Sequence, residues 1–550
     1  MYNCYDNIRK ITLAQKTLNR KVKKLKNRTG LKNWRMAMVV SVVAIIGIAV
    51  IFTSMASGPV RSVAEFGAVG NGVADDTIAL QTAIDTVSAS GTAAKSARVL
   101  NLPAGRYKIT KPLFIKSYVQ LKGTLGQSII EQAGADPNVY STIALGNAHP
   151  FAFDARHPLD PSGVKQIYTN MPTTTSTFAK DATDITLSNP ADVARMQVDE
   201  IACVRSQAGL PFGDAASGYD QPDIIQFNKI TAISGNTIKF ADKNLNTIAN
   251  PVVCKVEGRD PFSTYVMGRD IPWYAAQSVE VSGITFRGAK SGLDRGLCYE
   301  CVVKNVNFEN SDRPMLLNAL VKNTFSDINA TYNGRGLEIK MASTQSVFKN
   351  INLTYKPADG ENTEVWPVDV GERSVDITLD NLRIDDAGSA RKVALVSFGD
   401  SQRVTLKNSK FDVQSTGGCV GSVPPDPERP CSVFDIRGNY NSGGINFVTE
   451  DFTISSNTFN MKVNTRRQLV SMGDRLLRND ATYVVKKIKF KSNRWSGVKV
   501  PTNLAYWAIN NVENWSLTNE VIRAASTILV SNGSQQPAIT NSVCGNSNCQ

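Results

Sequence analysis

The sequence EFGAVGNGVADDTIALQTAI (residues 65–84), followed by NLPAGRYKI (residues 101–109), decides the fold of this chain. Gly67, Gly70 and Gly72 lie in a turn-rich entry, because glycine adopts positive φ at little cost. In the second stretch a Pro-Ala-Gly turn separates two short runs that alternate apolar and polar residues, which is typical of strands. The two stretches together predict a glycine-rich turn, a helix and then the first strands of a β-rich domain.

The helix is expected to begin directly after the glycine-rich turn. Asp75, Asp76 and Thr77 supply residue types that favour the N-cap and the first turn. Gly91 is expected just past the end of the helix. The apolar stripe at 3.6-residue spacing is expected to contain Ile78, Ala79, Ala83, Ile84 and Val87. The adjacent aspartates are therefore interpreted as capping groups rather than as catalytic carboxylates.

These motifs resemble the opening of the pectate-lyase superfamily domain. Relatives in that superfamily include rhamnogalacturonase-like hydrolases, polygalacturonase-like hydrolases of the glycosyl hydrolase family 28-related type, epimerase-like proteins and phage tailspikes. The resemblance covers residues 63–126 closely, with Asn71 in place of the usual Asp of a Gly-Asp-Gly turn. It implies an all-β fold, a single-stranded right-handed parallel β-helix capped by the early helix, and a protein that handles polysaccharide.

A repeat from residue 279 onward also indicates a solenoid. One strand pattern recurs at 281–286, 303–308, 325–330 and 348–353, at spacings of 22, 22 and 23 residues. A side-chain period of two inside a repeat of about 22 residues is typical of a solenoid coil. Later copies of the pattern occur at 379–384, 406–411, 454–459, 490–495 and 517–522. One position of the pattern is expected to form a ladder of amide hydrogen bonds through Asn305, Asn350, Asn381, Asn408 and Asn519.

Charge is distributed unevenly along the 550 residues, whose net charge is +13. Residues 1–35 hold eleven Lys and Arg and a single acid, Asp6, so the rest of the chain is close to neutral. This distribution argues against a nucleic-acid partner, since such proteins bind through basic surfaces. Residues 36–56 contain no charged residue for 21 positions, long enough to span a bilayer.

The order of these segments predicts a single-pass membrane protein. Positive charge before residues 36–56 favours a cytoplasmic N-terminus and an extracytoplasmic β-helix, periplasmic or extracellular. The alternative is secretion after cleavage near Ser54-Met55-Ala56, and both routes export residues 57–550. The expected organisation is a basic cytoplasmic tail (1–35), a transmembrane signal-anchor (36–56), the capping helix and first coils (57–126), a β-rich insertion with early coils (127–278), β-helix coils (279–525) and a C-terminal tail with a Cys pair (526–550).

Eight cysteines follow the apolar segment, and an even number is typical of disulfides in an exported protein. Cys203 is expected to pair with Cys254, while Cys419–Cys431 and Cys544–Cys549 are interpreted as local loop clips. The remaining candidates, Cys298 and Cys301, form a Cys-x-x-Cys that also fits a metal or redox site. Zinc is disfavoured because no second Cys pair has ligand spacing and the chain has only two His, so the metal content is unknown from the sequence.

A second strand in each coil carries the candidate catalytic residues. Its copies at 337–341, 367–371 and 434–438 alternate so that apolar side chains point inward. The outward residues are Glu338, Lys340, Asp369, Asp435 and Arg437. On a parallel stack equivalent residues lie about 4.8 Å apart per coil, so Glu338 and Lys340 are expected beside Asp369. Trp366 and Arg335 are the candidate substrate-binding residues, because an indole stacks on sugar rings and a guanidinium pairs with acidic groups.

Two reactions fit this row of residues. Hydrolysis needs a protonated acid and a carboxylate, which Asp369 with Glu338 or Asp435 would supply, and the adjacent Asp385 and Asp386 are an alternative pair. A lyase would use Lys340, Arg335 or Arg437 as a base, with a cation near Asp369 or Asp435 to acidify the carbon. No cofactor is required for hydrolysis, whereas a divalent cation such as Ca²⁺ is expected if the reaction is a lyase reaction.

A mixed acidic and basic face suits an acidic polysaccharide. The polygalacturonase-type set of Asn-x-Asp, Asp-Asp, Gly-His-Gly and Arg-x-Lys is not present as a set, so hydrolase and lyase both stay open. We therefore expect a membrane-anchored or exported enzyme that acts on an acidic extracellular polysaccharide. The alternative is a non-catalytic carbohydrate-binding, adhesion or tailspike-like β-helix protein. Tailspike relatives form homotrimers, but nothing in this sequence demands one.

Overall fold

The computed structural model describes most of the chain from Val60 onward. The described residues are 60–133, 141–146, 168–206, 209–212, 219–222, 225–256, 259–260, 271–272, 274–288, 291–294, 296–356, 366–386, 394–413, 432–437, 448–461, 468–473, 485–496, 507–510, 512–522, 528–530, 534–544 and 547–548. Among them no helix is both long enough and apolar enough to cross a bilayer. Residues 1–35 and 36–56, the expected tail and anchor, lie outside them.

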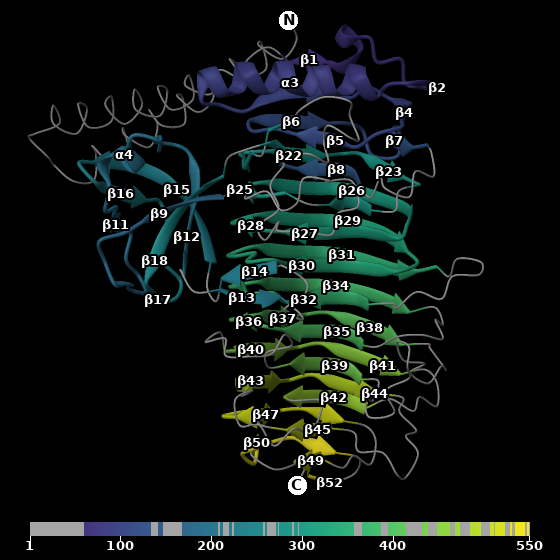
Figure 1. Ribbon diagram of the computed structural model, residues 1–550. Coiled ribbons are helices and arrows are strands. Elements are labelled where there is room, and N and C mark those ends of the chain that lie inside the picture. The colour runs from purple at the N-terminus through teal and green to yellow at the C-terminus, as the bar shows by residue number, and fades with distance from the viewer. Residues whose placement is uncertain are drawn as a thin grey trace, which may run out of the picture. The chain divides into compact units, whose positions relative to one another are not determined.

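Parallel strands stacked coil upon coil form the main body of the described protein (Figure 1). Among the described residues these strands form two sheets, sheet A with 26 strands and sheet B with eleven. The strands of sheet B are β5 (Leu113–Ile115), β8 (Ser141–Leu145), β24 (Ser291–Asp294), β27 (Arg313–Asn318), β30 (Arg335–Lys340), β32 (Trp366–Val370), β35 (Ala394–Gly399), β39 (Ser432–Arg437), β42 (Gln468–Gly473), β45 (Trp507–Asn510) and β49 (Ile528–Val530). The all-β, parallel β-helix architecture expected from the sequence is confirmed.

Sheet A contains the repeated strand that the sequence predicts. Its coil strands include β22 (Glu280–Ser282), β23 (Thr285–Arg287), β26 (Val302–Ser311), β29 (Thr324–Tyr332), β31 (Val347–Tyr355), β34 (Thr378–Asp386), β37 (Thr405–Lys407), β38 (Lys410–Val413), β40 (Glu450–Ser455), β41 (Thr458–Met461), β43 (Val485–Lys491), β44 (Arg494–Ser496), β47 (Ser516–Thr518) and β48 (Val521–Ile522). Val303, Phe325 and Phe348 pair in register in successive coils and are fully buried. The rings of Phe325 and Phe348 stack at 5.0 Å, so the period-two apolar residues form the core.

The recurring asparagine of the repeat lies at a bend in each coil. Left-handed φ values of 54°, 55°, 57°, 55° and 53° occur at Asn305, Asn350, Asn381, Asn408 and Asn519. Asparagine tolerates this conformation better than most residues, which explains its recurrence. The predicted ladder is present in part, because Asn381 donates to Asn350 (2.8 Å) and Asn350 donates to Asp327 (2.8 Å). Asn408 instead donates to Asp380 (2.8 Å), so the ladder changes partner there.

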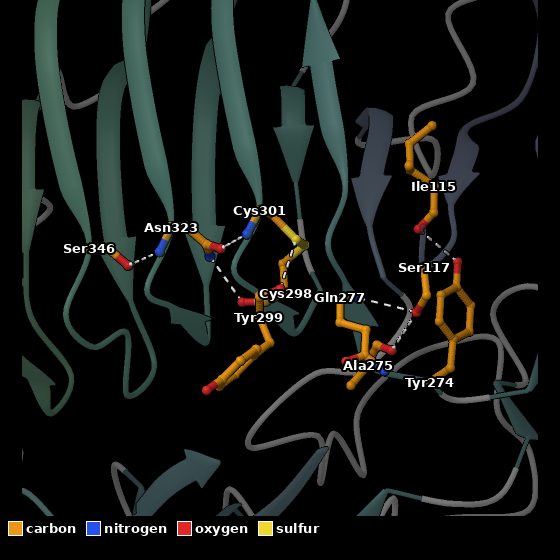
Figure 2. Close-up of a disulfide and its surroundings, with 10 residues drawn as sticks. All are labelled: Ile115, Ser117, Tyr274, Ala275, Gln277, Cys298, Tyr299, Cys301, Asn323 and Ser346. Atoms are coloured by element: carbon orange, nitrogen blue, oxygen red, sulfur yellow. Dashed lines mark hydrogen bonds between the residues drawn. A yellow bond between two sulfur atoms is a disulfide. The ribbon is translucent and has the colours of Figure 1, made fainter. Parts of the chain in front are cut away.

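A second polar ladder, not predicted from the sequence, runs through buried residues. Figure 2 shows its first part, where Asn323 Oδ1 accepts from the Cys301 amide (2.5 Å) and the Asn323 amide donates to Ser346 (3.1 Å). In later coils each backbone N–H donates to the side chain one coil further on, along Ser409, Asn457, Asn493, Glu520 and Ser542. These bonds satisfy backbone groups that the coil corners would otherwise leave unpaired.

The capping helix α3 (Thr77–Ala94) begins at the expected place, with Asp76 as its N-cap residue. The Asp76 side chain makes no cap bond and instead accepts from the amides of Val69 (2.6 Å) and Gly70 (3.1 Å). The residue before the N-cap supplies the hydrogen bond instead, since Asp75 Oδ1 accepts from the amide of Thr77, the first helical residue, at 3.0 Å. Asp76 therefore ties the glycine-rich turn to the helix start.

The buried face of α3 also differs in two places from the expected stripe. Ile78 is exposed and Leu80 is buried, because the stripe that contacts the first coil runs through Leu80, Ala83, Ile84 and Val87. Gly91 lies inside the helix rather than past its end. A Cβ at Gly91 would lie 2.7 Å from the Cβ of Tyr118, so this glycine permits close packing on the coil.

A six-stranded antiparallel sheet is inserted between two coils. Its strands are β9 (Tyr168–Pro172), β11 (Asp184–Thr186), β12 (Ile201–Ser206), β15 (Ile225–Ser234), β16 (Thr237–Phe240) and β18 (Pro251–Val256). The solenoid continues directly across it, since β6 (Val119–Lys122) pairs with β22, with Leu121 opposite Val281. The insertion contacts the solenoid through Asp242, which accepts from the Tyr299 hydroxyl (2.6 Å) and pairs with Lys322.

The structure contains the expected Cys203–Cys254 disulfide and joins the two cysteines whose role the sequence left open. Cys203 and Cys254 lie opposite each other on β12 and β18 and are bonded. Cys298 and Cys301 are also bonded, which excludes free thiols for a metal site in this structure (Figure 2). The expected clips Cys419–Cys431 and Cys544–Cys549 lie outside the residues whose side chains are described.

Candidate functional site

The candidate residues form a column across sheet B. Glu338 on β30 pairs with Asp369 on β32, which pairs with Ser397 on β35. Ser397 pairs in turn with Asp435 on β39. The parallel register therefore brings the three carboxylates into one column, as the strand alternation predicts, with Asp435 two coils beyond Asp369.

These carboxylates are not exposed to solvent, in contrast to the outward-facing row expected from the sequence. Glu338, Asp369 and Asp435 are 1%, 2% and 0% exposed. Glu338 and Asp369 each lie beside a long cationic side chain, and all three carboxylates stack in register between strands of adjacent coils. Arg335 Nη1 lies 2.7 Å from Glu338 Oε1, and Lys340 Nζ lies 2.6 Å from Asp369 Oδ2. Burial of a carboxylate is costly without such a partner, and these cations compensate Glu338 and Asp369 for the hydration that they lose.

Glu372 joins this cluster, although the sequence analysis did not identify it. It follows Gly371 at the corner after β32, and its Oε1 lies 3.9 Å from Lys340 Nζ. Asp369 Oδ2 and Glu372 Oε1 contact the same ammonium, at 2.6 and 3.9 Å. These two oxygens therefore lie at most about 6.5 Å apart, within the range of paired carboxyl groups in glycosidases. Strand alternation does not extend to a corner residue, and the available signal was an acid directly after the glycine that ends the strand.

Burial and neighbouring charges shift the pKa values of both Glu372 and Lys340. Burial raises the pKa of Glu372, and the negative charges of Asp369 and Glu338 raise it further. The positive charge of Lys340 lowers it, but the pKa stays above its ordinary value. Burial by itself would lower the pKa of Lys340, but Asp369, Glu372 and Glu338 raise it above its ordinary value. Glu372 therefore holds its proton more readily than an ordinary glutamic acid, while Lys340 remains an ammonium.

The corner that carries Glu372 has an unusual backbone. Met341–Ala342 and Glu372–Arg373, at equivalent corners of adjacent coils, have left-handed φ values of 53° and 59°, and of 52° and 67°. They are the only adjacent pairs of positive-φ residues within the described ranges. Such conformations are costly for residues with a Cβ and cluster at functional sites. The paired left-handed residues distinguish these two corners from the other bends of the described coils, where left-handed residues occur singly.

One edge of the cluster reaches solvent. The side chains of Arg335, Lys340 and Glu372 are 28%, 13% and 22% exposed, whereas those of Glu338 and Asp369 are nearly covered. Glu338 Oε2 and Glu372 Oε2 are buried and have no hydrogen-bond partner among the described residues. A ligand that approaches the cluster would first meet the cations of Arg335 and Lys340 and the carboxyl group of Glu372.

The other candidate residues lie in different places. Asp385 is exposed on β34 in sheet A, and Asp386 ends that strand, so this pair belongs to a different sheet from Asp369. Trp366 begins β32 and pairs with Arg335, and Arg437 ends β39 and pairs with Gly399. The side chains of Asp386, Trp366 and Arg437 lie outside the described set.

The described residues contain no group of three or more His, Cys, Asp or Glu arranged to hold a metal ion. Glu338 and Asp369 each contact a cation already, at 2.7 and 2.6 Å. The chemistry of this donor set fits ion pairing better than Ca²⁺ coordination, which takes six to eight oxygen ligands.

Comparisons with known proteins identify one family. The family model described as rhamnogalacturonase A/epimerase, pectate lyase-like, matches residues 60–338, which include the early coils, the insertion and Glu338. No curated protein matches the chain.

Several solved structures are similar to this chain. The tailspike protein gp49 of Pseudomonas phage LKA1 is 14% identical over 86% of this chain and 83% of its own, with a TM-score of 0.39. The Streptococcus pneumoniae surface protein and adhesin PfbA is 13% identical over 89% and 98%, with a TM-score of 0.46. The Azotobacter vinelandii mannuronan C-5 epimerase AlgE4 A-module is 14% identical over 89% and 99%, with a TM-score of 0.42.

Proposed function

Because this chain belongs to the rhamnogalacturonase A/epimerase, pectate lyase-like family, we propose that it is an enzyme that cleaves an acidic extracellular polysaccharide at the cluster around Lys340. The observation that carries the proposal is the placement of two carboxyl groups, Asp369 and Glu372, against one ammonium. The left-handed backbone at Glu372 and Arg373 adds support, since strain of this kind is common at functional sites.

The cluster supports hydrolysis better than elimination. Glycoside hydrolysis uses one protonated carboxyl group as general acid and one carboxylate as nucleophile or base. The raised pKa of Glu372 suits the acid, and Asp369, ion-paired with Lys340, suits the carboxylate. A lyase would need a neutral base, whereas the raised pKa of Lys340 keeps that side chain protonated. A Ca²⁺ requirement is expected only if elimination is the reaction after all.

Substrate charge follows from the exposed edge of the cluster. Arg335 and Lys340 present the two cations that a polymer meets there, and a guanidinium binds a carboxylate through paired hydrogen bonds. An acidic sugar next to the scissile bond would contact these groups while Glu372 faces the glycosidic oxygen. A uronate polymer is therefore the proposed substrate class.

We further propose that residues 36–56 anchor the enzyme in a membrane with the β-helix on the extracytoplasmic side. The charge-free run of 21 residues and the basic tail before it support this proposal. The two disulfides among the described residues also fit an oxidising compartment.

The test is an assay of the full chain, purified in detergent, against a panel of uronate polymers and neutral glucans. We expect reducing ends to appear from an acidic polymer and kcat to fall by about 10²–10⁴-fold in Glu372→Gln and Asp369→Asn. The matched control is Glu309→Gln, which neutralises an ion-paired carboxylate of sheet A, 2.9 Å from Arg287. It should retain activity.

The outcomes separate the alternatives. Products that absorb as unsaturated uronates, and activity that a chelator removes, would replace the hydrolase by a lyase. A chain that binds acidic polymers but never cuts them would support the carbohydrate-binding or adhesion alternative. Burial of Glu338 and Asp369 is what favours that alternative, because a structural ion-pair network is also buried.

A further inference from the structure

One coil of sheet A carries an unusual concentration of positive charge. Between Lys486 and Trp495, on β43 and β44, the residues that are not buried are Lys or Arg with the single exception of Ser492. The inward residues Ile488, Phe490 and Trp495 are buried in the core. The outward ones are Lys486, Lys487, Lys489, Lys491 and Arg494.

The solenoid does not need these cations for stacking. In register with Lys489, the three preceding coils carry Thr453, Thr405 and Thr378. The coil after β43 carries Ser516 at that position. Lys486, Lys487 and Lys489 pair with acids of the adjacent coils, at 3.2, 3.0 and 4.0 Å from Glu513, Glu450 and Asp451. Within the described residues, the charges of Lys491 and Arg494 have no such explanation.

Two further cations lie in the same columns two coils earlier. Lys407 pairs with Ser455, which pairs with Lys491. Lys410 pairs with Thr458, which pairs with Arg494. Two coils correspond to about 9.6 Å, because stacked strands lie about 4.8 Å apart. Four cations thus form the corners of a rectangle on the outer face of sheet A.

The floor of this rectangle is polar and uncharged. Ser455 and Thr458 lie between the two rows of cations, and Asn408, Ser456 and Ser492 occupy the bend between the two columns. Asn408 and Ser456 are exposed, as are Lys410, Lys491 and Arg494. Hydroxyl and amide groups on such a floor donate and accept hydrogen bonds, as sugar hydroxyl groups require.

Acidic residues only partly neutralise the rectangle. Lys407 lies 3.6 Å from Asp380, and Lys410 lies 2.6 Å from Asp412, with the two lysine side chains 40% and 50% exposed. Surface ion pairs of this kind are weak, so both ammonium groups remain available to a ligand. Lys491 and Arg494 have no acidic partner among the described residues. The row formed by Lys491 and Arg494 therefore carries most of the positive charge that no acid neutralises.

We propose that Lys407, Lys410, Lys491 and Arg494 form a second, non-catalytic binding site for an acidic polysaccharide chain. The site lies in sheet A, whereas the proposed catalytic cluster lies on sheet B (Figure 1). Carboxylates on successive repeats of the polymer pair with successive rows of cations, while its hydroxyl groups contact the floor. The choice of polymer rests on the proposed function, but the site itself does not depend on catalysis.

A nucleic acid fits these observations less well. The floor contains no aromatic side chain on which a base would stack, and single-stranded nucleic acids depend on such contacts. The basic groups are confined to two rows, and the chain after residue 35 is close to neutral. Duplex DNA is therefore the competing ligand in the test rather than the proposed one.

The experiment measures binding of the full chain to a fluorescent oligouronate in the presence of detergent. Lys491→Ala/Arg494→Ala should weaken binding at least about tenfold, because each charge-assisted hydrogen bond contributes roughly that factor. The matched control is Lys180→Ala/Lys239→Ala, which removes two exposed cations from the insertion and should leave the affinity unchanged. Both variants alter exposed side chains, and an unchanged thermal unfolding curve verifies the fold.

The proposal is overturned if both double variants lose affinity equally, or if neither does. It is also overturned if duplex DNA or a neutral oligosaccharide of equal length binds the rectangle as tightly as the oligouronate. Asp369→Asn in the same assay separates the two sites, since it should lower kcat by about 10²–10⁴-fold and leave oligouronate binding at Lys491 and Arg494 intact. Loss of cleavage in every preparation, with binding retained, would remove the proposed function and keep this site.

Discussion

Glu520 should make the last coils less stable as the pH rises. Its side chain is fully buried, its Oε1 accepts from the amide and the side chain of Asn493 (both 2.9 Å), and its Oε2 accepts from Trp495 Nε1 (2.9 Å). It occupies a place in the buried ladder that Asn457 and Asn493 hold in the two preceding coils. A titratable group thus replaces a neutral amide inside the solenoid.

The size of this stability change follows from the pKa shift of the Glu520 carboxyl group. Burial raises the pKa of Glu520 from 4.5 to about 7, although the hydrogen bonds from Asn493 and Trp495 lower it. The folded chain then holds the proton up to about pH 7, while the unfolded chain releases it near 4.5. Because the folded state binds more protons in that window, stability falls as pH rises through it and is constant above it. The full loss is about 3 kcal/mol.

Hydrogen exchange of the segment around residues 485–522 measures this effect, since it reports local opening in a protein whose coils need not unfold together. The opening free energy of the wild-type chain, relative to Glu520→Gln, should fall by about 3 kcal/mol between pH 4.5 and pH 7.5. Glutamine keeps the side-chain volume and one acceptor oxygen but does not titrate. A difference that stays constant across this pH range would refute the reasoning.

Two further predictions concern the core and the N-terminal segment. Phe459→Ala should lower the free energy of unfolding by about 3–5 kcal/mol. The reason is that Phe459 is fully buried and stacks between Phe411 (4.7 Å) and Trp495 (4.0 Å). Urea unfolding measures this loss, and a value below about 1 kcal/mol would contradict the prediction. The full chain should stay in the membrane pellet on alkaline extraction while a chain that lacks residues 36–56 is released, and a mature protein that begins near residue 57 would show cleavage instead.

The fold was largely predictable because its information is local and repeated. The 22-residue spacing and the period-two alternation at 303–308, 325–330 and 348–353 correspond to in-register, buried residues in the structure. Parallel stacking adds one coil at a time, so each repeat meets the same neighbours. The helix caps were less predictable, since whether Asp75 or Asp76 caps α3 depends on the distant amides of Val69 and Gly70.

The candidate site was predictable only in part. Alternation and repeat length placed Glu338, Asp369 and Asp435 in one column, and the register agrees. Their burial did not follow from alternation, because the exposure of a side chain depends on what lies beside it in the neighbouring coils. Glu372 could not be found from strand periodicity, since it lies on a corner.

The sequence alone therefore determined the coils, the order of their strands and the columns of residues that share one register, all of which depend on spacing along the chain. Only the tertiary structure decided which charges meet. Lys340 reaches Asp369 and Glu372 from the preceding coil, and Lys407 lies in one column with Lys491 although 83 residues separate them. The physical reason is that ion pairing and burial depend on distances of a few ångström between coils, which the intervening chain lengths do not reveal.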